Sequence, residues 1–222
     1  MTLTLHYHPF SSFCQKVLVA LYEREVPFEK VVVNLSDPAK KAAFERLWPM
    51  GKFPVLHDEA GGITVPESSL IIEYLDRAHP GPPPLVPLDP DEALKARLWD
   101  RFFDHYVEHP LQKVVGDALR PEGNRDPSGV DEAKAVLGRA YDLLETSLGD
   151  GRICMAGDAF TLADCGAAPA LFYANMVGPF GGRPRLEAYY ARLRGRSSFA
   201  RAVDEAREFR HFFPLPWPDG WD

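Results

Sequence analysis

The segment 80–90, PGPPPLVPLDP, divides the chain into two stretches of different character. Proline lacks a backbone N–H and fixes φ, so this segment cannot sustain a helix. We therefore predict a stiff, proline-rich linker over residues 80–90. The 222 residues fit either one large domain or two small units that share an interface.

Residues 1–79 alternate between short strand-like and helix-like segments. Residues of high β-propensity indicate the strands, and apolar residues three or four positions apart indicate the helices. The predicted strands are 2–7, 28–35, 53–57 and 63–65, and the predicted helices are 13–24, 37–47 and 67–78. This βαβαββα order is the arrangement of an α/β thioredoxin-like domain.

Two local patterns refine this prediction. The continuous run Val31-Val32-Val33 is typical of a strand that is buried on both faces inside an α/β layer. Residues 59–62, EAGG, lie between the last two predicted strands and are typical of a hairpin turn.

The remaining residues, 91–222, have a helical pattern with a polar loop over 120–129. The predicted helices are 92–119, 130–148, 162–177, 184–194 and 199–207. The sequence therefore predicts an α/β thioredoxin-like domain over 1–79, the linker, and an all-α helical-bundle domain over 91–222.

Charge and cysteine content restrict the partners and the compartment. The formal net charge of −7 argues against a nucleic-acid partner, because nucleic-acid binders present basic surfaces to phosphate. The three cysteines, Cys14, Cys154 and Cys165, form no disulfide framework, so we expect a reducing compartment. We see no signal peptide and no apolar run near the roughly 20 residues that span a membrane. These features predict a cytoplasmic protein without a membrane partner.

The first polar cluster is residues 7–17, YHPFSSFCQKV, where a predicted strand passes into a helix. Free backbone N–H groups and the positive end of the helix dipole at such a turn favour an anion, and a thiolate is one. A hydroxyl of Ser11 or Ser12 can donate a hydrogen bond to a bound sulfur. Alternatively, both serines only cap the helix.

The second cluster is residues 48–56, WPMGKFPVL, with Pro54 just inside a predicted strand. Proline at that place normally indicates an edge strand. A cis Phe53–Pro54 bond would instead turn the backbone and expose the N–H and C=O of Phe53 to a ligand. Because only about 5–6% of X–Pro bonds are cis, the residues alone do not establish this.

The third cluster is residues 65–69, VPESS, where a predicted strand ends and a helix begins. Ser68 and the free N–H groups can receive a carboxylate, while Glu67 can receive an ammonium group. The alternative is an ordinary helix N-terminus with an acidic residue in its first turn.

Taken together, in this order and at these distances, the clusters resemble the glutathione transferase family. The family shows a Tyr or Ser at the first strand–helix turn, a G-K-x-P-V-L element and an E/Q-S pair before the third helix. Here these correspond to Tyr7 and Ser11, to residues 51–56, and to Glu67-Ser68. Residues 160–164, FTLAD, also resemble the capping box of a core helix in the family, and the side chains of Thr and Asp in it can cap each other reciprocally.

The resemblance implies a glutathione site. In this site Pro54 would be cis, Phe53 would pair its backbone with the cysteinyl unit, and Glu67 and Ser68 would hold the γ-glutamyl end. The glycyl carboxylate would meet a lysine. The candidate lysines are Lys52, Lys40 and Lys41, and the last two are explained equally well as solvated helix residues.

For activation of the thiol, the resemblance implies three candidates. Ser11 stands where serine-type transferases have their active serine, so we place it first, and Tyr7, in the place of the active tyrosine of other classes, second. Ser12 would exchange with Ser11 if the alignment shifted by one residue. We expect Cys14 to be a small buried residue. The resemblance implies no metal and no cofactor, with glutathione as a co-substrate.

The second substrate is expected between the two domains, against Phe10, Phe13 and the first long helix of the helical domain. The aromatic-rich stretch of that helix comprises Phe102, Phe103, His105 and Tyr106. We expect at least two of these four to be core residues and assign Phe103 and Tyr106 to the hydrophobic substrate site. His105 and His109 lack a third ligand nearby, so we interpret them as solvent-facing or capping residues.

The predicted function is that of a glutathione transferase, acting in detoxification as a homodimer. The enzyme would activate the glutathione thiol as thiolate for attack on an electrophilic, largely apolar substrate. One alternative is a glutathione-dependent thiol reductase or isomerase, although Phe13 stands where zeta-type isomerases have a cysteine. The other alternative is a non-catalytic relative that binds a protein partner.

Overall fold

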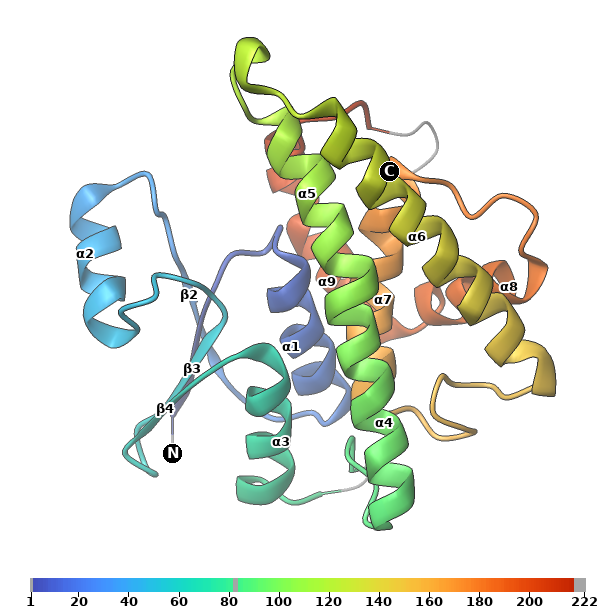
Figure 1. The fold of residues 1–222 in the computed structure, drawn as a ribbon. Coiled ribbons are helices and arrows are strands. Elements are labelled where there is room, and N and C mark those ends of the chain that lie inside the picture. Colours follow the sequence, from blue (N-terminus) through green and yellow to red (C-terminus); the bar gives the residue numbers. More distant parts are fainter. Residues whose placement is uncertain (1, 82–83, 218–222) are drawn as a thin grey trace.

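The computed structural model of the protein describes residues 2–81 and 84–217. Pro82 and Pro83 of the predicted linker lie outside the described residues. The first part of the chain forms a four-stranded sheet with the order β2-β1-β3-β4 (Figure 1). Its strands are β1 (Leu3–Tyr7), β2 (Glu29–Val32), β3 (Val55–Asp58) and β4 (Ile63–Pro66). β1 is parallel to β2 and antiparallel to β3, and β3 and β4 form the predicted antiparallel hairpin.

Three helices accompany this sheet: α1 (Ser12–Glu23), α2 (Pro38–Leu47) and α3 (Ser68–Ala78). α1 is buried on all sides over residues 14–21, because it lies between the sheet and the helices of the second part of the chain (Figure 1). α2 lies apart from α1 and α3, and its Phe44 packs with Val33 and Val55 in a small separate cluster.

The second part of the chain is helical. Its elements are α4 (Pro90–Phe102), the π-helical turn η1 (Phe103–Glu108), α5 (His109–Ala118), η2 (Glu122–Asn124), α6 (Pro127–Ser147), η3 (Leu148–Asp150), α7 (Leu162–Val177), α8 (Pro184–Arg194), α9 (Ser197–Ala206) and η4 (Arg207–Phe212). The predicted fold class, a thioredoxin-like α/β domain followed by a helical domain, is confirmed. No helix among the described residues has the length and apolar character that crossing a membrane requires.

The helix predicted over 92–119 contains a π turn. α4, η1 and α5 follow one another along one long rod (Figure 1), and the N–H of His109 bonds to the C=O of Asp104, five residues back. Pro110 explains the wide turn, because it has no N–H to donate to the C=O of Tyr106 and its ring crowds the preceding turn. The turn ends at Glu108, a buried residue with 3% of its surface exposed.

The prediction that the valine run is buried on both faces is wrong. All four residues of β2 are exposed, with 41% of Val31 and 46% of Val32 accessible. β2 is an edge strand that pairs only with β1, and α2 packs on Val33 rather than on the strand itself. An edge position leaves the residues of the strand open to solvent even when they are β-branched.

The described part of the proline-rich segment is attached to both parts of the chain. Leu85 is fully buried, and the N–H groups of Leu85 and Val86 donate to the carboxylate of Asp76 at 3.2 and 2.6 Å. The C=O of Leu85 accepts from the N–H of Leu162 at 2.8 Å. Pro90 already belongs to α4, in the first turn, where a missing N–H is tolerated.

The start of α7 has the predicted capping box. The side chain of Thr161 accepts from the N–H of Ala163 at 3.3 Å, and Asp164 accepts from the N–H of Thr161 at 2.9 Å. α7 is buried from Leu162 through Ala174 and contacts α1, so it forms the core of the helical part against the thioredoxin-like part.

Candidate active site

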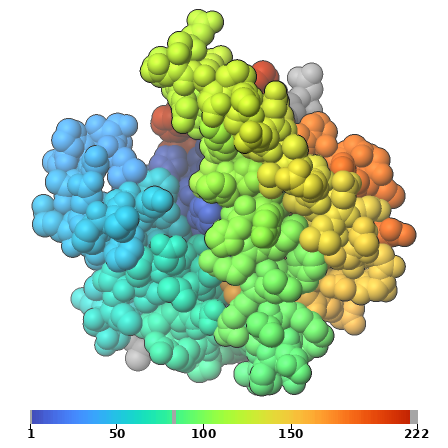
Figure 2. Space-filling model, viewed as in Figure 1, coloured from blue at the N-terminus to red at the C-terminus, as the bar shows by residue number. Residues whose placement is uncertain are grey.

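An open pocket of about 450 Å³ lies between the thioredoxin-like part and the helices α4, η1 and α5. In the space-filling view a recess separates the blue α2 from the green helices, with dark blue N-terminal residues at its floor (Figure 2). The pocket is lined by Ser11, Phe13, Leu35, Gly51, Lys52, Phe53, Pro54, Glu67, Ser68, Arg101, Asp104, His105, His109 and Gln112. The fold thus brings residues of all three polar clusters of the sequence to one pocket.

Ser11 is the N-cap of α1, with φ −91° and ψ 124°. Its Oγ accepts from the N–H of Cys14 at 3.4 Å, so the serine does cap the helix. A serine hydroxyl whose oxygen accepts the capping hydrogen bond can still donate its hydrogen to another acceptor. Ser11 lines the pocket. Its hydroxyl also lies against the thiol of Cys14, which is a weak acceptor that a ligand can replace. The capping role and a hydrogen bond to a ligand are therefore compatible.

Ser12 points elsewhere. Its hydroxyl donates to Oε2 of Glu108 at 2.9 Å, and the residue lines a second pocket rather than the one around Phe53. The two adjacent serines therefore have separate partners, which follows from the rotation of about 100° per residue at the start of a helix.

The two other groups considered for thiol chemistry are buried. Tyr7 is 4% exposed and does not line the pocket; burial, reinforced by the charge of Glu205, raises its pKa to about 12. Cys14 has no exposed surface, and burial raises its pKa to about 12. The interpretation of Cys14 as a small buried residue is confirmed.

The bond between Phe53 and Pro54 is cis, as predicted from the resemblance. Both residues line the pocket, together with Lys52. Gly51, which precedes them, has φ +62°, a conformation that glycine adopts without the steric cost of a Cβ. The loop from Gly51 to Pro54 therefore presents its backbone on the pocket wall.

Glu67 has an unusual backbone conformation, with φ +68° and ψ 118°. For a residue other than glycine this costs on the order of 1–3 kcal/mol, and such strain is typical of functional sites. Glu67 is the N-cap of α3 but makes no side-chain capping bond, so its carboxylate can bind a ligand. Ser68 follows as the first residue of α3, where backbone N–H groups lack helical partners.

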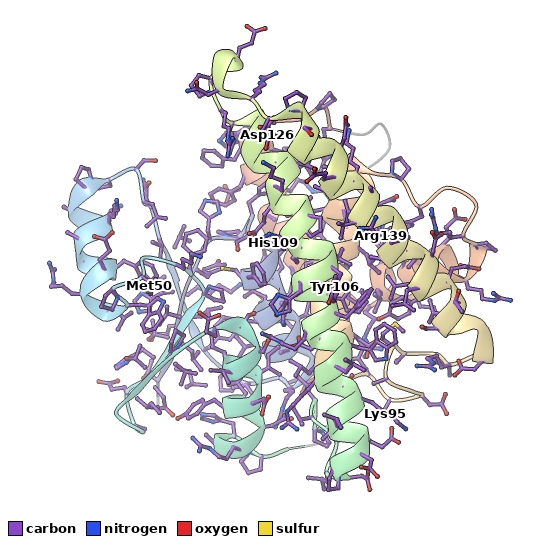
Figure 3. The ribbon with its side chains drawn as sticks, in the orientation of Figure 1. Met50, Lys95, Tyr106, His109, Asp126 and Arg139 are labelled. Atoms are coloured by element: carbon purple, nitrogen blue, oxygen red, sulfur yellow. The ribbon has the colours of Figure 1, made fainter. Side chains whose placement is uncertain are left out.

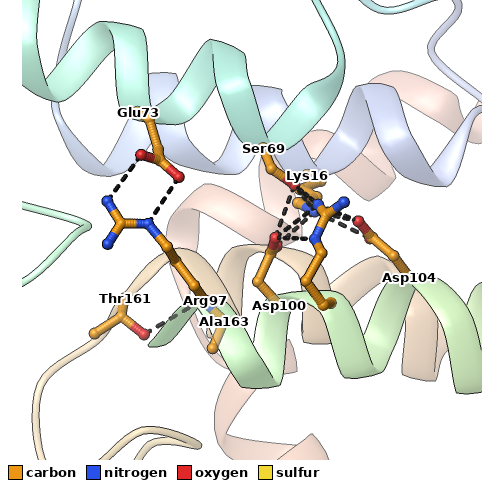
Figure 4. Close-up of polar contacts among 9 residues, drawn as sticks. Lys16, Ser69, Glu73, Arg97, Asp100, Asp104, Thr161 and Ala163 are labelled. Atoms are coloured by element: carbon orange, nitrogen blue, oxygen red, sulfur yellow. Dashed lines mark hydrogen bonds and ion pairs between the residues drawn. The ribbon is translucent and has the colours of Figure 1, made fainter. Parts of the chain in front are cut away.

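A network of charges with a buried centre joins the start of α3 to the long helix opposite (Figure 4). The ammonium of Lys16 lies 2.6 Å from Asp100 and 3.0 Å from Asp104, and it donates to Ser69 at 2.9 Å. Ser69 in turn donates to Asp100 at 2.7 Å. Arg101 completes the network with an ion pair to Asp104 at 2.6 Å. Two cations and two carboxylates balance in charge, and they fix the pocket wall that Glu67 and Ser68 occupy.

Four lining residues were not predicted from the sequence: Leu35, Arg101, Asp104 and Gln112. Asp100 and Asp104 are spaced i,i+4, and Lys16 lies in an otherwise apolar helix, which together signal a buried ion network. His105 and His109 are exposed, as expected, but they also line the pocket. Figure 3 shows His109 on the helix side of the recess and Met50 on the loop across from it.

Two aromatic residues of the long helix, Phe103 and Tyr106, do not lie where they were predicted. Phe103 is fully buried in the core, and Phe102 is 8% exposed. Tyr106 is 54% exposed and packs on the ring of Phe102 at 5.3 Å between centroids, outside both pockets. At least two of the four residues are core, as expected. Neither Phe103 nor Tyr106 is among the described residues that line these two pockets, because they lie on other faces of the helix.

A second pocket of about 330 Å³ adjoins the first at Ser11. It lies between the start of α1, the helix α5 and the C-terminal segment. It is lined by Phe10, Ser11, Ser12, Glu108, Leu111, Gln112, Val115, Gly116, Leu119, Tyr173, Phe212, Phe213 and Pro214. Its wall is mainly apolar and aromatic, and Glu108 is the only acidic residue among the described residues that line it.

Lys40 and Lys41 do not line the pocket. Both belong to the exposed helix α2, where Lys41 lies 3.7 Å from Glu45. Lys52 lines the pocket directly. Among the described residues, no group of three or more His, Cys, Asp or Glu side chains is placed to hold a metal ion.

Comparison with known proteins gives consistent matches. The model of the glutathione S-transferase N-terminal domain matches residues 5–83, and that of the C-terminal domain matches residues 127–192. Glutathione S-transferases F13 and F6 of Arabidopsis thaliana are 30% and 32% identical, covering 90% and 88% of this chain and 94% and 96% of their own lengths.

Among solved structures, a glutathione S-transferase of Methylobacterium radiotolerans in complex with glutathione sulfonate is 31% identical. Its TM-score is 0.79, with 91% of this chain and 95% of that chain covered. A glutathione S-transferase of Methylobacillus flagellatus with bound glutathione is 28% identical, with a TM-score of 0.81 and coverage of 90% and 98%.

Proposed function

The chain belongs to the glutathione S-transferase family, and we propose that it binds glutathione in the larger pocket and activates its thiol as a thiolate. The observation that carries this proposal is the hydroxyl of Ser11, which lines the pocket at the N-terminus of α1. The thiolate then attacks an electrophilic, largely apolar substrate.

Ser11 stabilises the thiolate together with the first turn of α1. The helix dipole and the free N–H groups favour an anion there. A hydrogen bond to a charged group contributes about 1.5–3 kcal/mol, which corresponds to about one to two units in the pKa of the thiol. Tyr7 is a weaker candidate because it is buried away from the pocket.

The proposed glutathione contacts follow the lining of the pocket. The backbone of Phe53, beside the cis Pro54, pairs with the cysteinyl unit. Glu67 receives the γ-glutamyl ammonium, while Ser68 and the start of α3 receive its carboxylate. Lys52 pairs with the glycyl carboxylate, and Lys40 is left out because α2 does not reach the pocket.

The second pocket is proposed to hold the electrophile. It shares Ser11 with the first pocket, so a carbon bound there lies next to the sulfur. Phe10 and the C-terminal residues Phe213 and Pro214 supply its apolar surface. The domain boundaries 1–79, 80–90 and 91–222, the cytoplasmic location and the role in detoxification are parts of the same proposal.

We extend the proposal to a homodimer. Leu70 of α3 and Leu94 and Leu98 of α4 are 54%, 67% and 61% exposed on neighbouring helices, which an ion pair between Arg97 and Glu73 joins at 2.9 Å. Exposed leucines that gather on adjoining helices are typical of an association surface. Sedimentation equilibrium at micromolar concentration tests this, and a monomer alone would refute it.

The thiolate is tested by ultraviolet difference titration with glutathione near neutral pH. The wild type should show a saturable thiolate band. Ser11→Ala should reduce the band about tenfold or more at equal saturation, and Ser12→Ala should retain it, because the hydroxyl of Ser12 is directed to Glu108. Saturable binding without a thiolate band would point to a binding protein instead, and an equal loss in both variants would refute the assignment to Ser11.

A further inference from the structure

Glu108 is an acidic residue that the proposed thiol chemistry does not use. It ends the π turn η1, is 3% exposed, and lines the second pocket. One carboxyl oxygen, Oε2, accepts from the hydroxyl of Ser12 at 2.9 Å. The other oxygen has no hydrogen bond to a described residue. The carboxyl group therefore lies on the wall of an apolar pocket with one oxygen unengaged.

Glu108 differs from Asp164, another deeply buried acid of the helical part. Asp164 accepts from the N–H groups of Met155 and Thr161 and from the hydroxyl of Tyr189, so its oxygens are satisfied by the fold. A buried carboxyl group with a single hydrogen bond is costly to the fold. Buried, incompletely paired acids in pockets are therefore candidates for a functional role.

The surroundings of Glu108 favour the protonated form of its carboxyl group. The charged and titratable groups near it are Lys16 of α1, Asp104 of η1 and Tyr173 of α7, while α5 and the C-terminal segment contribute neutral residues to the pocket. Burial raises the pKa of Glu108 to about 8; Asp104 adds to this effect, and Ser12 and Lys16 oppose it. At pH 7 the carboxyl group is mostly neutral and can donate a proton.

We propose that Glu108 is the general acid that protonates the carbonyl oxygen of an α,β-unsaturated ketone or aldehyde as the glutathione sulfur adds to it. This inference rests on the proposed function and names its substrate class. The pocket that contains Glu108 also contains Ser11, so the acid and the thiolate site face one bound molecule. The aromatic residues Phe10, Tyr173 and Phe213 line the same pocket and suit a flat conjugated substrate.

The thiolate of glutathione forms a bond to the β-carbon. The electron pair of the C=C π bond then forms a double bond between the α-carbon and the carbonyl carbon, and the electron pair of the C=O π bond moves to the oxygen. Glu108 gives its proton to that oxygen, which yields an enol and a carboxylate. The enol then tautomerises to the ketone. The proton released when the glutathione thiol ionised is equivalent to the one that returns Glu108 to its neutral form.

Two reactions of the same thiolate separate this role from general damage to the site. Addition to benzylideneacetone needs a proton on oxygen, whereas substitution on chlorodinitrobenzene releases chloride and needs none. Glu108→Gln keeps the shape of the side chain and an oxygen that can accept from Ser12. We expect the kcat/KM for benzylideneacetone, divided by that for chlorodinitrobenzene, to fall at least about tenfold. A ratio that changes less than threefold overturns the proposal.

The pH profile is an independent readout. A general acid works in its protonated form, so in the wild type the addition rate per thiolate should decline above pH 8, the region of the pKa of Glu108. The substitution rate should show no such decline. In Glu108→Gln, the addition rate should no longer decline above pH 8. A profile with the same decline in both reactions, or one that persists in Glu108→Gln, overturns the proposal.

Two further variants provide a second test and a control. Ser12→Ala removes the hydrogen bond that lowers the pKa of Glu108, so the decline should move to higher pH; this variant carries the test if Glu108→Gln does not fold. Leu119→Ala, on the same pocket wall, should change both rates by a similar factor. Absence of a thiolate band in the wild type would defeat the proposed function itself, whereas an intact band with an unchanged rate ratio defeats only the role of Glu108.

Discussion

Replacement of Asp164 by alanine should destabilise the protein more than any other single change at the start of α7. Asp164 is fully buried and accepts from the N–H groups of Met155 and Thr161 at 2.8 and 2.9 Å and from the hydroxyl of Tyr189 at 2.6 Å. Alanine leaves these three buried donors, and the hydroxyl of Thr161 that donates to Asp164 at 3.2 Å, without this acceptor. The two hydroxyl groups can rotate, whereas the two backbone N–H groups cannot. Each unsatisfied N–H costs about 1–3 kcal/mol, so we expect the free energy of unfolding to fall by about 2–6 kcal/mol.

Asparagine at the same position should destabilise the protein less than alanine does. The carboxamide has one oxygen, which can replace either the oxygen that faces Thr161 or the one that faces Met155 and Tyr189. The tyrosine hydroxyl can rotate to accept from the amide, but a backbone N–H cannot. One buried N–H stays unpaired, so Asp164→Asn should cost about 1–3 kcal/mol. Thr161→Ala, which loses the capping bond from the N–H of Ala163 and the bond from the threonine hydroxyl to Asp164, should cost about 1 kcal/mol.

Equilibrium urea unfolding followed by far-ultraviolet circular dichroism measures all three variants. The expected order of destabilisation is Asp164→Ala, then Asp164→Asn, then Thr161→Ala. A loss below about 1 kcal/mol for Asp164→Ala would refute the reasoning. So would equal losses for alanine and asparagine, because the argument depends on the number of donors left unpaired.

Three further changes have expected outcomes. Lys16→Met removes the cation held 2.6 Å from Asp100 and 3.0 Å from Asp104, so the free energy of unfolding should fall by about 3–5 kcal/mol at pH 7. Burial already raises the pKa of Asp104. A carboxyl group whose pKa is raised by folding destabilises the protein as the pH rises, so the difference in free energy of unfolding between wild type and Lys16→Met should be smaller at pH 4 than at pH 7. A larger difference at pH 4 in urea unfolding would contradict this. Cys14, Cys154 and Cys165 are buried and their pKa values are raised by burial, so a chromogenic disulfide reagent should react slowly with the native protein and with three thiols in urea; a fast native thiol would contradict their burial. Glu67→Gly should relieve the strain at φ +68° and raise the free energy of unfolding by about 1 kcal/mol while weakening glutathione binding in the same titration as above; a loss of both would show that the conformation at Glu67 is not strained.

The elements of the fold were predictable where local chemistry decides them. The helix predicted over 162–177 has those bounds in the structure, because Thr161 and Asp164 cap its start and apolar residues follow without a break. β2 was predicted as a strand, but its environment was not. Val31 has the same β-propensity in a central strand and at an edge, and only the sheet order decides which it occupies.

The candidate site was predictable in its N-terminal half only. Ser11, Phe53 and Glu67 lie in short motifs that begin or end elements, so their positions follow from local sequence. On the long helix, the π turn before Pro110 changes which side chains face the pockets. Tyr106 was assigned to the substrate site because it lies in an aromatic-rich stretch, whereas Glu108 is the residue of η1 that lines the second pocket.

The two adjacent serines at the start of α1 divide the proposed reaction between the two parts of the chain. Ser11 faces the pocket formed largely by the loops of the thioredoxin-like part, and Ser12 hydrogen-bonds to Glu108 of the helical part. One helix turn thus contacts both the sulfur site and the acid. Under this proposal the thiolate depends on residues before position 80, while the class of electrophile depends on position 108. A change at Glu108 should then alter which substrates react and leave the affinity for glutathione within about twofold, since that carboxyl group does not line the glutathione pocket. Calorimetric titration of Glu108→Gln with glutathione measures this directly, and a tenfold weaker affinity would show that the two functions are not separable at this helix turn.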